Sequence, residues 1–165
     1  MTEWTSRDAT PCPPEYIEFA GRLADAAGEV VRQYFRKPFE IITKADESPV
    51  TIADRESERV MRELIEAEYP EHGILGEEHG TVRGDAEYVW YLDPIDGTKS
   101  FISGIPLFGT LIGLAKTEGD LRHPYMGVID QAITGERWIG APGHGTTLNG
   151  EAVRVRQCPS VDKAT

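Results

Sequence analysis

Residues 88–98 read YVWYLDPIDGT, an apolar segment that ends abruptly in acid. The apolar part is typical of a strand, and Asp93 and Asp96 follow it, three positions apart. The proline between them fixes its own φ and lacks a backbone donor, so we expect a stiff turn. Gly97 permits a backbone conformation or a close approach that a side chain would block. The stretch therefore predicts a strand and then a turn that aims both carboxylates into one cavity, with the carbonyl of Ile95 available as a further oxygen ligand.

The spacing of the two aspartates separates this motif from other metal and phosphate motifs. D-x-x-D alone is weak evidence for a metal site, because acidic residues are common in turns, but D-P-I-D-G-T after an apolar strand is far more specific. EF-hand loops and the D-x-D nucleophile of haloacid-dehalogenase-type phosphatases both need a spacing of two. Lys99 and Ser100 lack the G-x-x-x-x-G frame of a P-loop. We therefore expect a hard cation such as Mg²⁺, which prefers oxygen ligands and substrate phosphate.

A second acidic group precedes this motif. Residues 73–78 read GILGEE, a short apolar segment between glycines that ends in Glu77 and Glu78. In isolation this pair is equally well explained as a surface pair at a strand end. Beside Asp93 and Asp96, one of the two glutamates becomes a third carboxylate ligand, and three carboxylates can hold two cations. Two cations stabilise both the attacking and the leaving oxygen of an in-line phosphoryl displacement.

Thr98 and Asp54 are the candidates for activating a water molecule. If a short helix begins near Thr98, the backbone amides of Gly97 and Thr98 point at a phosphate. The Thr98 hydroxyl can also position a metal-bound water, with Asp54 as its partner. Asp54 stands at the start of a predicted helix, directly after SPVTIA at residues 48–53. From local sequence alone, a capping or first-turn acid is the favoured interpretation of Asp54.

The spacing of apolar residues changes from helical to strand-like along the chain. It predicts helices over residues 15–35 and 51–69, separated by a strand at 39–43 and a polar loop at 44–49. Short apolar segments then alternate with glycine, proline and charged residues, which predicts strands at 74–75, 88–92, 108–116, 125–130, 137–140 and 153–155. Two helices followed by a run of strands indicate an α+β fold, with the helices packed on a mostly antiparallel sheet.

Composition indicates one globular domain. The chain has 165 residues, of which 39% are hydrophobic, enough for one buried core. Acidic residues outnumber basic ones by 28 to 17, and such a surface repels nucleic-acid backbones. No apolar run reaches the ~20 residues of a membrane span and no signal peptide is visible, so we expect a cytoplasmic protein without nucleic-acid or membrane partners. Cys12 and Cys158 form no C-x-x-C pair and are expected to be reduced thiols.

Four motifs resemble the inositol monophosphatase family, within the larger group that includes fructose-1,6-bisphosphatases. In chain order they are Lys44, Asp54, G-E-E at 76–78 and D-P-I-D-G-T at 93–98. The resemblance covers residues 15–156. It implies the N-terminal part of a layered α/β/α/β/α fold, and a Mg²⁺-dependent phosphatase that acts on a small phosphorylated alcohol.

The same resemblance implies roles for individual residues. The expected Mg²⁺ ligands are Glu77, Asp93, Asp96 and the carbonyl of Ile95. The expected catalytic residues are Asp54, Thr98 and Glu77, with Asp54 and Thr98 activating the nucleophilic water. The phosphate is expected to contact Asp96, Lys99 and the amides of Gly97 and Thr98.

The flanks of the acidic motif look most like the histidinol-phosphate phosphatase branch of the family. The likeness rests on residues 97–104, 106–114, 127–131, 136–140 and 146–150. That branch typically has a basic residue at the position of Lys99, where myo-inositol enzymes more often read T-N-F. The branch predicts hydrolysis of L-histidinol phosphate to L-histidinol in histidine biosynthesis. The alternatives are an inositol monophosphatase or a bisphosphate nucleotidase, with Lys99 as a solvated lysine and Trp138 as a core residue.

The resemblance also suggests how the chain is divided. Residues 1–14 are expected to be a flexible lead-in, 15–156 the metal-bearing portion and 157–165 a polar tail. The W-D-x-A-type motif of the family's second portion, whose Asp is a further metal ligand, has no counterpart here. We therefore expect a fragment or a truncated product, with apolar surface exposed where the second portion would pack. A complete protein is expected to be a homodimer, and a metal- or phosphate-binding domain without turnover is the alternative to an enzyme.

Overall fold

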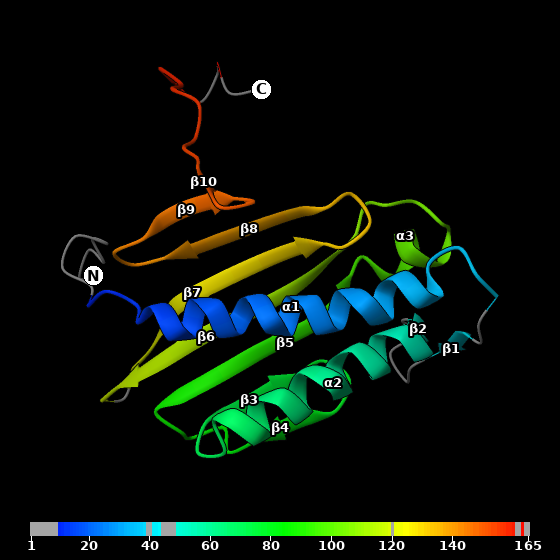
Figure 1. Cartoon of the computed structure of the whole chain (residues 1–165), viewed down its shortest axis with the longest axis horizontal. Helices are drawn as coiled ribbons and strands as arrows, with labels where there is room; N and C mark the ends of the chain where they lie inside the picture. Colours follow the sequence, from blue (N-terminus) through cyan, green and yellow to red (C-terminus); the bar gives the residue numbers. More distant parts are fainter. Residues whose placement is uncertain (1–9, 39–40, 44–48, 120, 161–162, 164–165) are drawn as a thin grey trace.

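The computed structural model describes residues 10–38, 41–43, 49–119, 121–160 and 163. Two long helices and a large sheet make up this part of the chain (Figure 1). Helix α1 spans Pro14–Tyr34 and helix α2 spans Ile52–Glu68, within one residue of the predicted bounds at every end. A proline opens α1, a position where its fixed φ suits a helix and its missing N–H costs no hydrogen bond.

The sheet has eight strands in the order β10-β9-β8-β7-β6-β5-β3-β4. Its neighbouring strands are antiparallel except for β3 and β5, which run parallel. A second sheet pairs β1 with β2. In chain order the remaining elements are β1 (Ile41–Thr43), β2 (Pro49–Thr51), β3 (Gly73–Gly76), β4 (Gly80–Val82), β5 (Tyr88–Asp96), α3 (Thr98–Ile102), β6 (Gly109–Glu118), β7 (Leu121–Gln131), β8 (Glu136–Ala141), β9 (Gly145–Leu148) and β10 (Glu151–Ala152).

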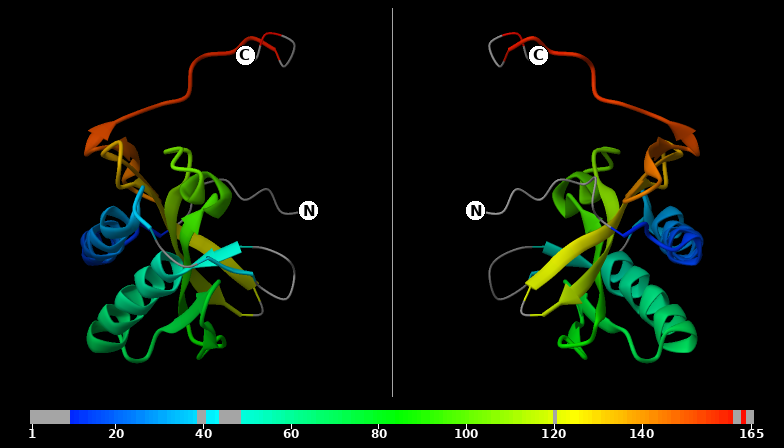
Figure 2. Two further views of the ribbon diagram at one scale, coloured as in Figure 1. Left: turned by 90° about the vertical axis from the view of Figure 1, so that its right-hand side faces the viewer. Right: turned by 90° about the vertical axis from the view of Figure 1, so that its left-hand side faces the viewer.

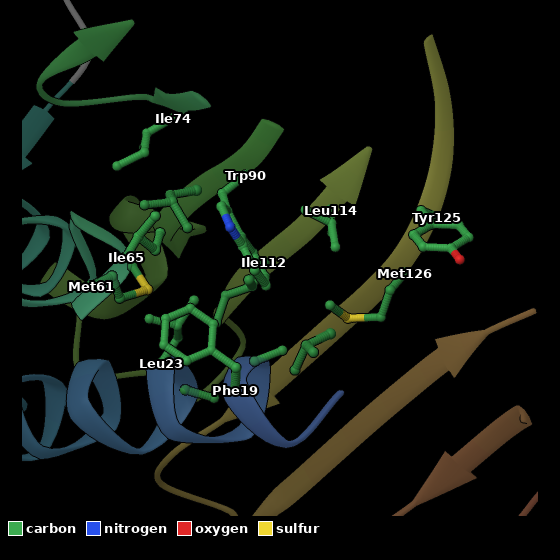
Figure 3. Close-up of a cluster of buried hydrophobic side chains, with 14 of the residues drawn as sticks. Phe19, Leu23, Met61, Ile65, Ile74, Trp90, Ile112, Leu114, Tyr125 and Met126 are labelled. Carbon is green, nitrogen blue, oxygen red and sulfur yellow. The ribbon is translucent and has the colours of Figure 1, made fainter. Parts of the chain in front are cut away.

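The main core lies between the long helices and the middle of the large sheet. Helices α1 and α2 both cover the same face of that sheet (Figure 2). Figure 3 shows Phe19 and Leu23 of α1, with Met61 of α2, gathered against Trp90 and Ile112 of the sheet. All five are fully or almost fully buried, and each such side chain contributes ~1.5–3 kcal/mol relative to leaving it in water.

A smaller core cluster supports the acidic end of the sheet. It contains Val31 of α1, Ala53 at the start of α2, Ile95 at the end of β5, and the phenylalanines Phe101 and Phe108. Residues of α1, α2, β5, α3 and the segment before β6 therefore pack together at the point where β5 ends. The acidic motif is attached to this cluster through Ile95, which is 1% exposed.

The acidic motif is the irregular end of a strand. The sequence predicted that the strand would end at residue 92 and that a turn would follow, but β5 runs on to Asp96. Its pairing with β6 is interrupted between Asp93 and Asp96, since Pro94 has no N–H to donate to the ladder. Thr110 of β6 donates its hydroxyl to the Pro94 carbonyl at 2.8 Å instead. The register of β5 thus shifts at the aspartates while the strand stays paired with β6.

Several shorter strands differ from the prediction. The end of the expected polar loop 44–49 belongs to β2, and residues 44–48 and 39–40 lie outside the described part of the chain. Strands β4 and β9 were not predicted, because each is only three or four residues long and carries little apolar pattern. The predicted strand at 153–155 is wrong. Strand β10 covers only Glu151–Ala152, although the Val153 amide still donates to the Thr146 carbonyl of β9 at 2.9 Å, and Val155 is 93% exposed.

The opposite face of the large sheet carries apolar side chains at its surface. Leu75 and Ile129 alternate with buried neighbours on their strands, and Trp138 alternates with half-buried ones. The exposed fractions of these three residues are 38%, 54% and 37%, respectively. Trp138 therefore lies outside both buried cores. Within the described residues, no helix is long and apolar enough to cross a membrane.

The described residues near the N-terminus are packed. Cys12 is buried, and its amide donates to the Pro142 carbonyl at 2.9 Å. The hydroxyl of Tyr125 donates to the Pro11 carbonyl, also at 2.9 Å. The last residues of the expected lead-in 1–14 are therefore packed against the rest of the chain, residues 1–9 lie outside the described part, and the expected division of the chain stays a prediction. Cys12 and the exposed Cys158 are both free thiols, as predicted.

Candidate active site

Asp54 belongs both to the helix cap and to the acidic cluster. The Thr51 hydroxyl accepts from the amides of Ala53 at 3.1 Å and Asp54 at 3.4 Å, while Asp54 Oδ2 accepts from the Thr51 amide at 2.8 Å and from its hydroxyl at 2.5 Å. This reciprocal capping box fixes the Asp54 side chain at the start of α2. Its other oxygen, Oδ1, lies 3.4 Å from the Thr98 hydroxyl. The local interpretation of Asp54 as a capping acid is thus confirmed, and the cap leaves one oxygen facing the acidic motif.

The parallel pairing of β3 and β5 brings Glu77 beside the aspartates. Gly76 lies opposite Leu92 in this pairing, and the Glu77 amide donates to the Leu92 carbonyl at 3.1 Å. Parallel strands end at the same edge of a sheet. Glu77 and Asp93, the next residues of the two strands, therefore meet at that edge, with the side chain of Glu77 exposed.

Asp93 is crowded by like charge. Burial raises the pKa of Asp93 to about 7, and a hydrogen bond with Glu77 and the charges of Glu77 and Asp96 add to the rise. The backbone amide of Ile95 opposes the rise by donating to the carboxylate. Asp93 Oδ1 is buried and has no hydrogen-bond partner among the described residues. A buried acceptor of this kind, surrounded by carboxylates, is the environment that a divalent cation relieves.

Asp54 shows the same electrostatic trend at the opposite side of the cluster. It is 2% exposed, and this burial raises its pKa. The hydrogen bonds from Thr51 and from its own amide lower the pKa, and the charge of Glu77 raises it further. The cap therefore keeps a buried carboxylate partly compensated, with its affinity for a proton above that of an ordinary aspartate.

Thr98 links Asp54 to the end of β5. Its hydroxyl donates at 3.2 Å to the carbonyl of Ile95, in addition to the 3.4 Å contact with Asp54. Helix α3 begins at Thr98 and has five residues. The predicted phosphate contact of the Gly97 and Thr98 amides required a short helix beginning at this point. Gly97 precedes it with φ of 98°, and a Cβ there would lie 3.0 Å from the Leu107 carbonyl. Both its backbone conformation and the close approach therefore favour glycine at this position.

The remaining predicted residues are placed less closely. Asp96 is exposed, lies opposite Gly109 of β6, and acts on Asp93 through its charge. Lys99 is exposed on α3, and in the described part of the chain its side chain forms no hydrogen bond or ion pair with the acidic cluster. Lys44 lies outside the described residues. The structure therefore brings together Asp54, Glu77, Asp93, Ile95, Asp96 and Thr98, while the assigned roles stay predictions.

The residues present fit Mg²⁺ if other ligands complete its shell. Among the described residues, no three His, Cys, Asp or Glu side chains are close enough together to hold an ion by themselves. Mg²⁺ usually takes only one or two carboxylates and completes its octahedron with water and substrate phosphate. The crowded Asp93, with one oxygen lacking a partner, and the adjacent Ile95 carbonyl are oxygen ligands of the required type.

Two residues that support the site were missed in the sequence. Thr51 completes the cap of Asp54, and the T-x-x-D spacing at residues 51–54 was a readable capping signature. Glu58 is 0% exposed and accepts hydrogen bonds from the backbone beyond Glu77. Its signal was the spacing of four from Asp54, which puts both acids on one face of α2.

Comparison with known proteins places this geometry in a family. The sequence profile of the inositol monophosphatase family matches residues 13–165. The chloroplastic bifunctional phosphatase IMPL2 of Arabidopsis thaliana is 54% identical over 144 residues, which are 86% of this chain and 40% of that protein. A histidinol-phosphatase of Chlorobaculum parvum is 39% identical over 140 residues, 84% of this chain and 52% of that protein. The chain thus spans about half the length of the curated relatives it matches.

The fold agrees with a solved member of the family. An inositol monophosphatase from Zymomonas mobilis superposes with a TM-score of 0.76 at 47% identity, covering 90% of this chain and 56% of that one. The predicted α+β fold with a mostly antiparallel sheet is confirmed, and its one parallel pair is the pair that carries Glu77 and Asp93. The chain belongs to the inositol monophosphatase family.

Proposed function

We propose that this chain supplies the catalytic end of a Mg²⁺-dependent phosphomonoesterase that acts on a small phosphorylated alcohol. The observation that carries the proposal is the convergence of four acidic residues, Asp54, Glu77, Asp93 and Asp96, on the edge where β3 and β5 end. Mg²⁺ bound there would neutralise the charge that develops on the attacking and leaving oxygens. Membership of the family supports this class of reaction.

The protein groups divide the work of hydrolysis between them. The Thr98 hydroxyl, within reach of Asp54 Oδ1, accepts a hydrogen bond from the attacking water and passes the proton on to that carboxylate. The raised pKa of Asp54 suits it to accept a proton. The water oxygen forms a bond to phosphorus as the bond from phosphorus to the alcohol oxygen breaks, and the alcohol oxygen takes a proton from solvent. The amides of Gly97 and Thr98 are proposed to hold the phosphate.

L-Histidinol phosphate is the proposed substrate. The proposal is supported by the likeness to the histidinol-phosphatase of Chlorobaculum parvum and by the basic Lys99 next to the phosphate position. The likeness to the Zymomonas mobilis enzyme favours an inositol monophosphate instead. A bisphosphate nucleotidase is the further alternative. A homodimer of the complete protein and a cytoplasmic location stay proposals, which sedimentation and cell fractionation address.

Turnover of three phosphate esters separates these possibilities. We would measure kcat/KM with histidinol phosphate, myo-inositol 1-phosphate and 3′-phosphoadenosine 5′-phosphate, for this chain and for any longer protein that contains it. Asp96→Asn should lower kcat/KM by roughly 100-fold to 1000-fold, the loss typical of removing one electrostatic stabiliser. Asp85→Asn, an exposed acid between β4 and β5, is the matched control.

The outcomes are distinct. Highest kcat/KM for histidinol phosphate supports the proposed substrate, and preference for another ester overturns it. Activity that survives EDTA, or that Asp96→Asn leaves unchanged, would overturn the proposed metal-dependent site. Mg²⁺ binding measured by calorimetry without any turnover would favour a binding domain.

A further inference from the structure

Glu58 is a buried acid that neither the helix cap nor the proposed ligand set uses. It lies on α2 one turn after Asp54 and on the same face of the helix. Its side chain is 0% exposed. Burying a carboxylate costs free energy unless hydrogen bonds and a cation compensate it, so the contacts of this side chain indicate what it is for.

Those contacts bind the turn that follows Glu77. Glu58 Oε2 accepts from the amide of Glu78 at 2.7 Å, and Oε1 accepts from the amide of His79 at 3.1 Å. Arg62, a further turn along α2, donates through Nε to Glu58 Oε1 at 2.7 Å and through Nη2 to the carbonyl of Gly80. Charge-assisted bonds to backbone amides are stronger than neutral ones. Three consecutive residues of the turn are therefore attached to α2.

The residue before Glu77 is fitted to the same carboxylate. A Cβ at Gly76 would lie 2.0 Å from Glu58 Oε1, so a side chain there would displace this carboxylate from the turn that it binds. On the other side of Glu77, the ring of His79 makes a 3.0 Å hydrogen bond with the carbonyl of Arg55, again on α2. The backbone on both sides of Glu77 is thus shaped by one helix.

We propose that Glu58 is a positioning residue, which with Arg62 holds Glu77 at the distance from Asp54 that the site needs. This inference rests on the proposed function, because it takes Glu77 as a metal ligand. Helix α2 carries Asp54 at its first turn and Glu58 one turn later. The same rigid helix therefore positions both Asp54 and the turn that follows Glu77. An exposed Glu77 on an untethered turn would sample many positions, and ordering it would cost part of the free energy of binding.

Two substitutions that remove charges of opposite sign test the proposal. In Glu58→Gln one oxygen becomes an NH₂ group that faces an amide donor, so the turn loses an anchor. Arg62→Gln loses the bond to Gly80 and the partner of Glu58. Both variants of the full chain should bind Mg²⁺ more weakly by calorimetry, roughly tenfold or more for Glu58→Gln, as is usual when a supporting partner of a metal ligand is lost. A field effect alone would weaken binding in Glu58→Gln and strengthen it in Arg62→Gln.

Matched controls come from the exposed face of the same helix. Arg59 and Glu63 form an ion pair at 2.5 Å, and Glu63→Gln and Arg59→Gln should each change the Mg²⁺ dissociation constant by less than about twofold. Hydrogen exchange should show faster exchange of the amides of Glu78 and His79 in Glu58→Gln. Titrations are made well below the unfolding temperature of each variant, so that a loss of stability does not change the affinity measured for folded protein.

Each outcome decides the inference. Weaker binding in both variants with faster exchange at the two amides supports positioning. Opposite shifts in the two variants, or unchanged affinity, overturn it. If Glu58→Gln does not fold, the direction of the shift in Arg62→Gln decides the inference: weaker Mg²⁺ binding supports positioning, and stronger binding overturns it. Absence of Mg²⁺ binding by the unmodified chain overturns the proposed function and this inference with it. If instead the unmodified chain binds Mg²⁺ and Glu58→Gln binds it equally well, only the inference about Glu58 is overturned.

Discussion

Each end of the β3–β5 pair holds an ionisable side chain that is partly or fully buried, and the surroundings of the two side chains are opposite in kind. At one end Asp93 has an oxygen without a described partner and lies beside Glu77 and Asp96. At the other end His72 is 3% exposed, and its Nδ1 accepts a hydrogen bond from Trp90 Nε1 at 3.1 Å. Burial is the largest cause of the pKa shift in both, raising the pKa of Asp93 and lowering the pKa of His72.

The surroundings of His72 are those of a structural group. Its ring stacks on Tyr69 at 4.7 Å and on Tyr88 at 5.1 Å, and Tyr16 meets it edge-on at 5.7 Å. Such ring pairs contribute ~0.5–1.5 kcal/mol each beyond their buried area. Burial alone therefore does not mark a functional site. The distinguishing feature is whether the buried polar atoms are satisfied by the protein, as at His72, or left for a ligand, as at Asp93.

The largest expected effect on stability is at His72, where the protein itself satisfies the buried ring. His72→Ala removes the ring contacts with the three tyrosines and with Trp90 and leaves the buried Trp90 N–H without an acceptor, so we expect the free energy of unfolding to fall by ~2–4 kcal/mol. Urea denaturation followed by tryptophan fluorescence measures it. His123→Ala, at a half-buried position on β7, should change the free energy of unfolding by less than ~0.5 kcal/mol. Equal losses in the two variants would contradict the structural role assigned to His72.

How far the sequence predicted the molecule depends on the range of the interaction involved. The long helices were predicted to within one residue, because their apolar spacing is local. The groups of the acidic site were also found, since the motif around Asp93 is contiguous. The parallel pairing that puts Glu77 beside Asp93 was not predictable, because residues 77 and 93 are joined by β4 and its loops, whose sequence carries no register signal.

Non-local contacts also explain the specific errors. The strand was predicted to end at residue 92 because the apolar run stops there, but the carbonyl of Pro94 and the side chain of Thr110 keep β5 attached to β6. Val153 and Val155 have strand-forming side chains, yet their neighbour β9 is short, and β10 ends at Ala152 with one further bond from the Val153 amide to the Thr146 carbonyl. Glu58 was overlooked because an acid inside an otherwise charged helix looks like surface until the turn that it binds is known.

A smaller effect of opposite sign is expected at the acidic end. Asp93→Asn removes one of the crowded carboxylates, so without Mg²⁺ the free energy of unfolding should rise by ~0.5–2 kcal/mol, as is common when a functional strain is removed. Mg²⁺ should then stabilise the variant less than it stabilises the unmodified chain. Thermal unfolding with and without Mg²⁺ measures both changes.

Asp130→Asn is the contrasting control for that variant. Asp130 is buried and pairs with Arg137 at 2.6 Å, so its loss leaves a cation partly unpaired and should destabilise the chain. Destabilisation by Asp93→Asn in the absence of Mg²⁺ would contradict the view that the acidic end sacrifices stability for ligand binding.

The smallest expected effect is the contribution of His72 to the pH dependence of the free energy of unfolding. Trp90 donates to Nδ1, so the neutral ring with its proton on Nε2 fits, and a second proton on Nδ1 would face the indole N–H. Burial lowers the pKa of His72, while Glu71 and Glu87 act against it. A pKa that is lower in the folded than in the unfolded chain gives stability that is fully present above the unfolded value of about 6.5 and is lost as pH falls through the folded value. The loss cannot exceed ~1.4 kcal/mol per pH unit in that window. Urea midpoints measured from pH 7.5 to 5 and compared with those of His72→Gln isolate this contribution. The difference in midpoint between the two proteins should shrink as pH falls. A difference that stays constant would show that His72 is not held neutral by its partners.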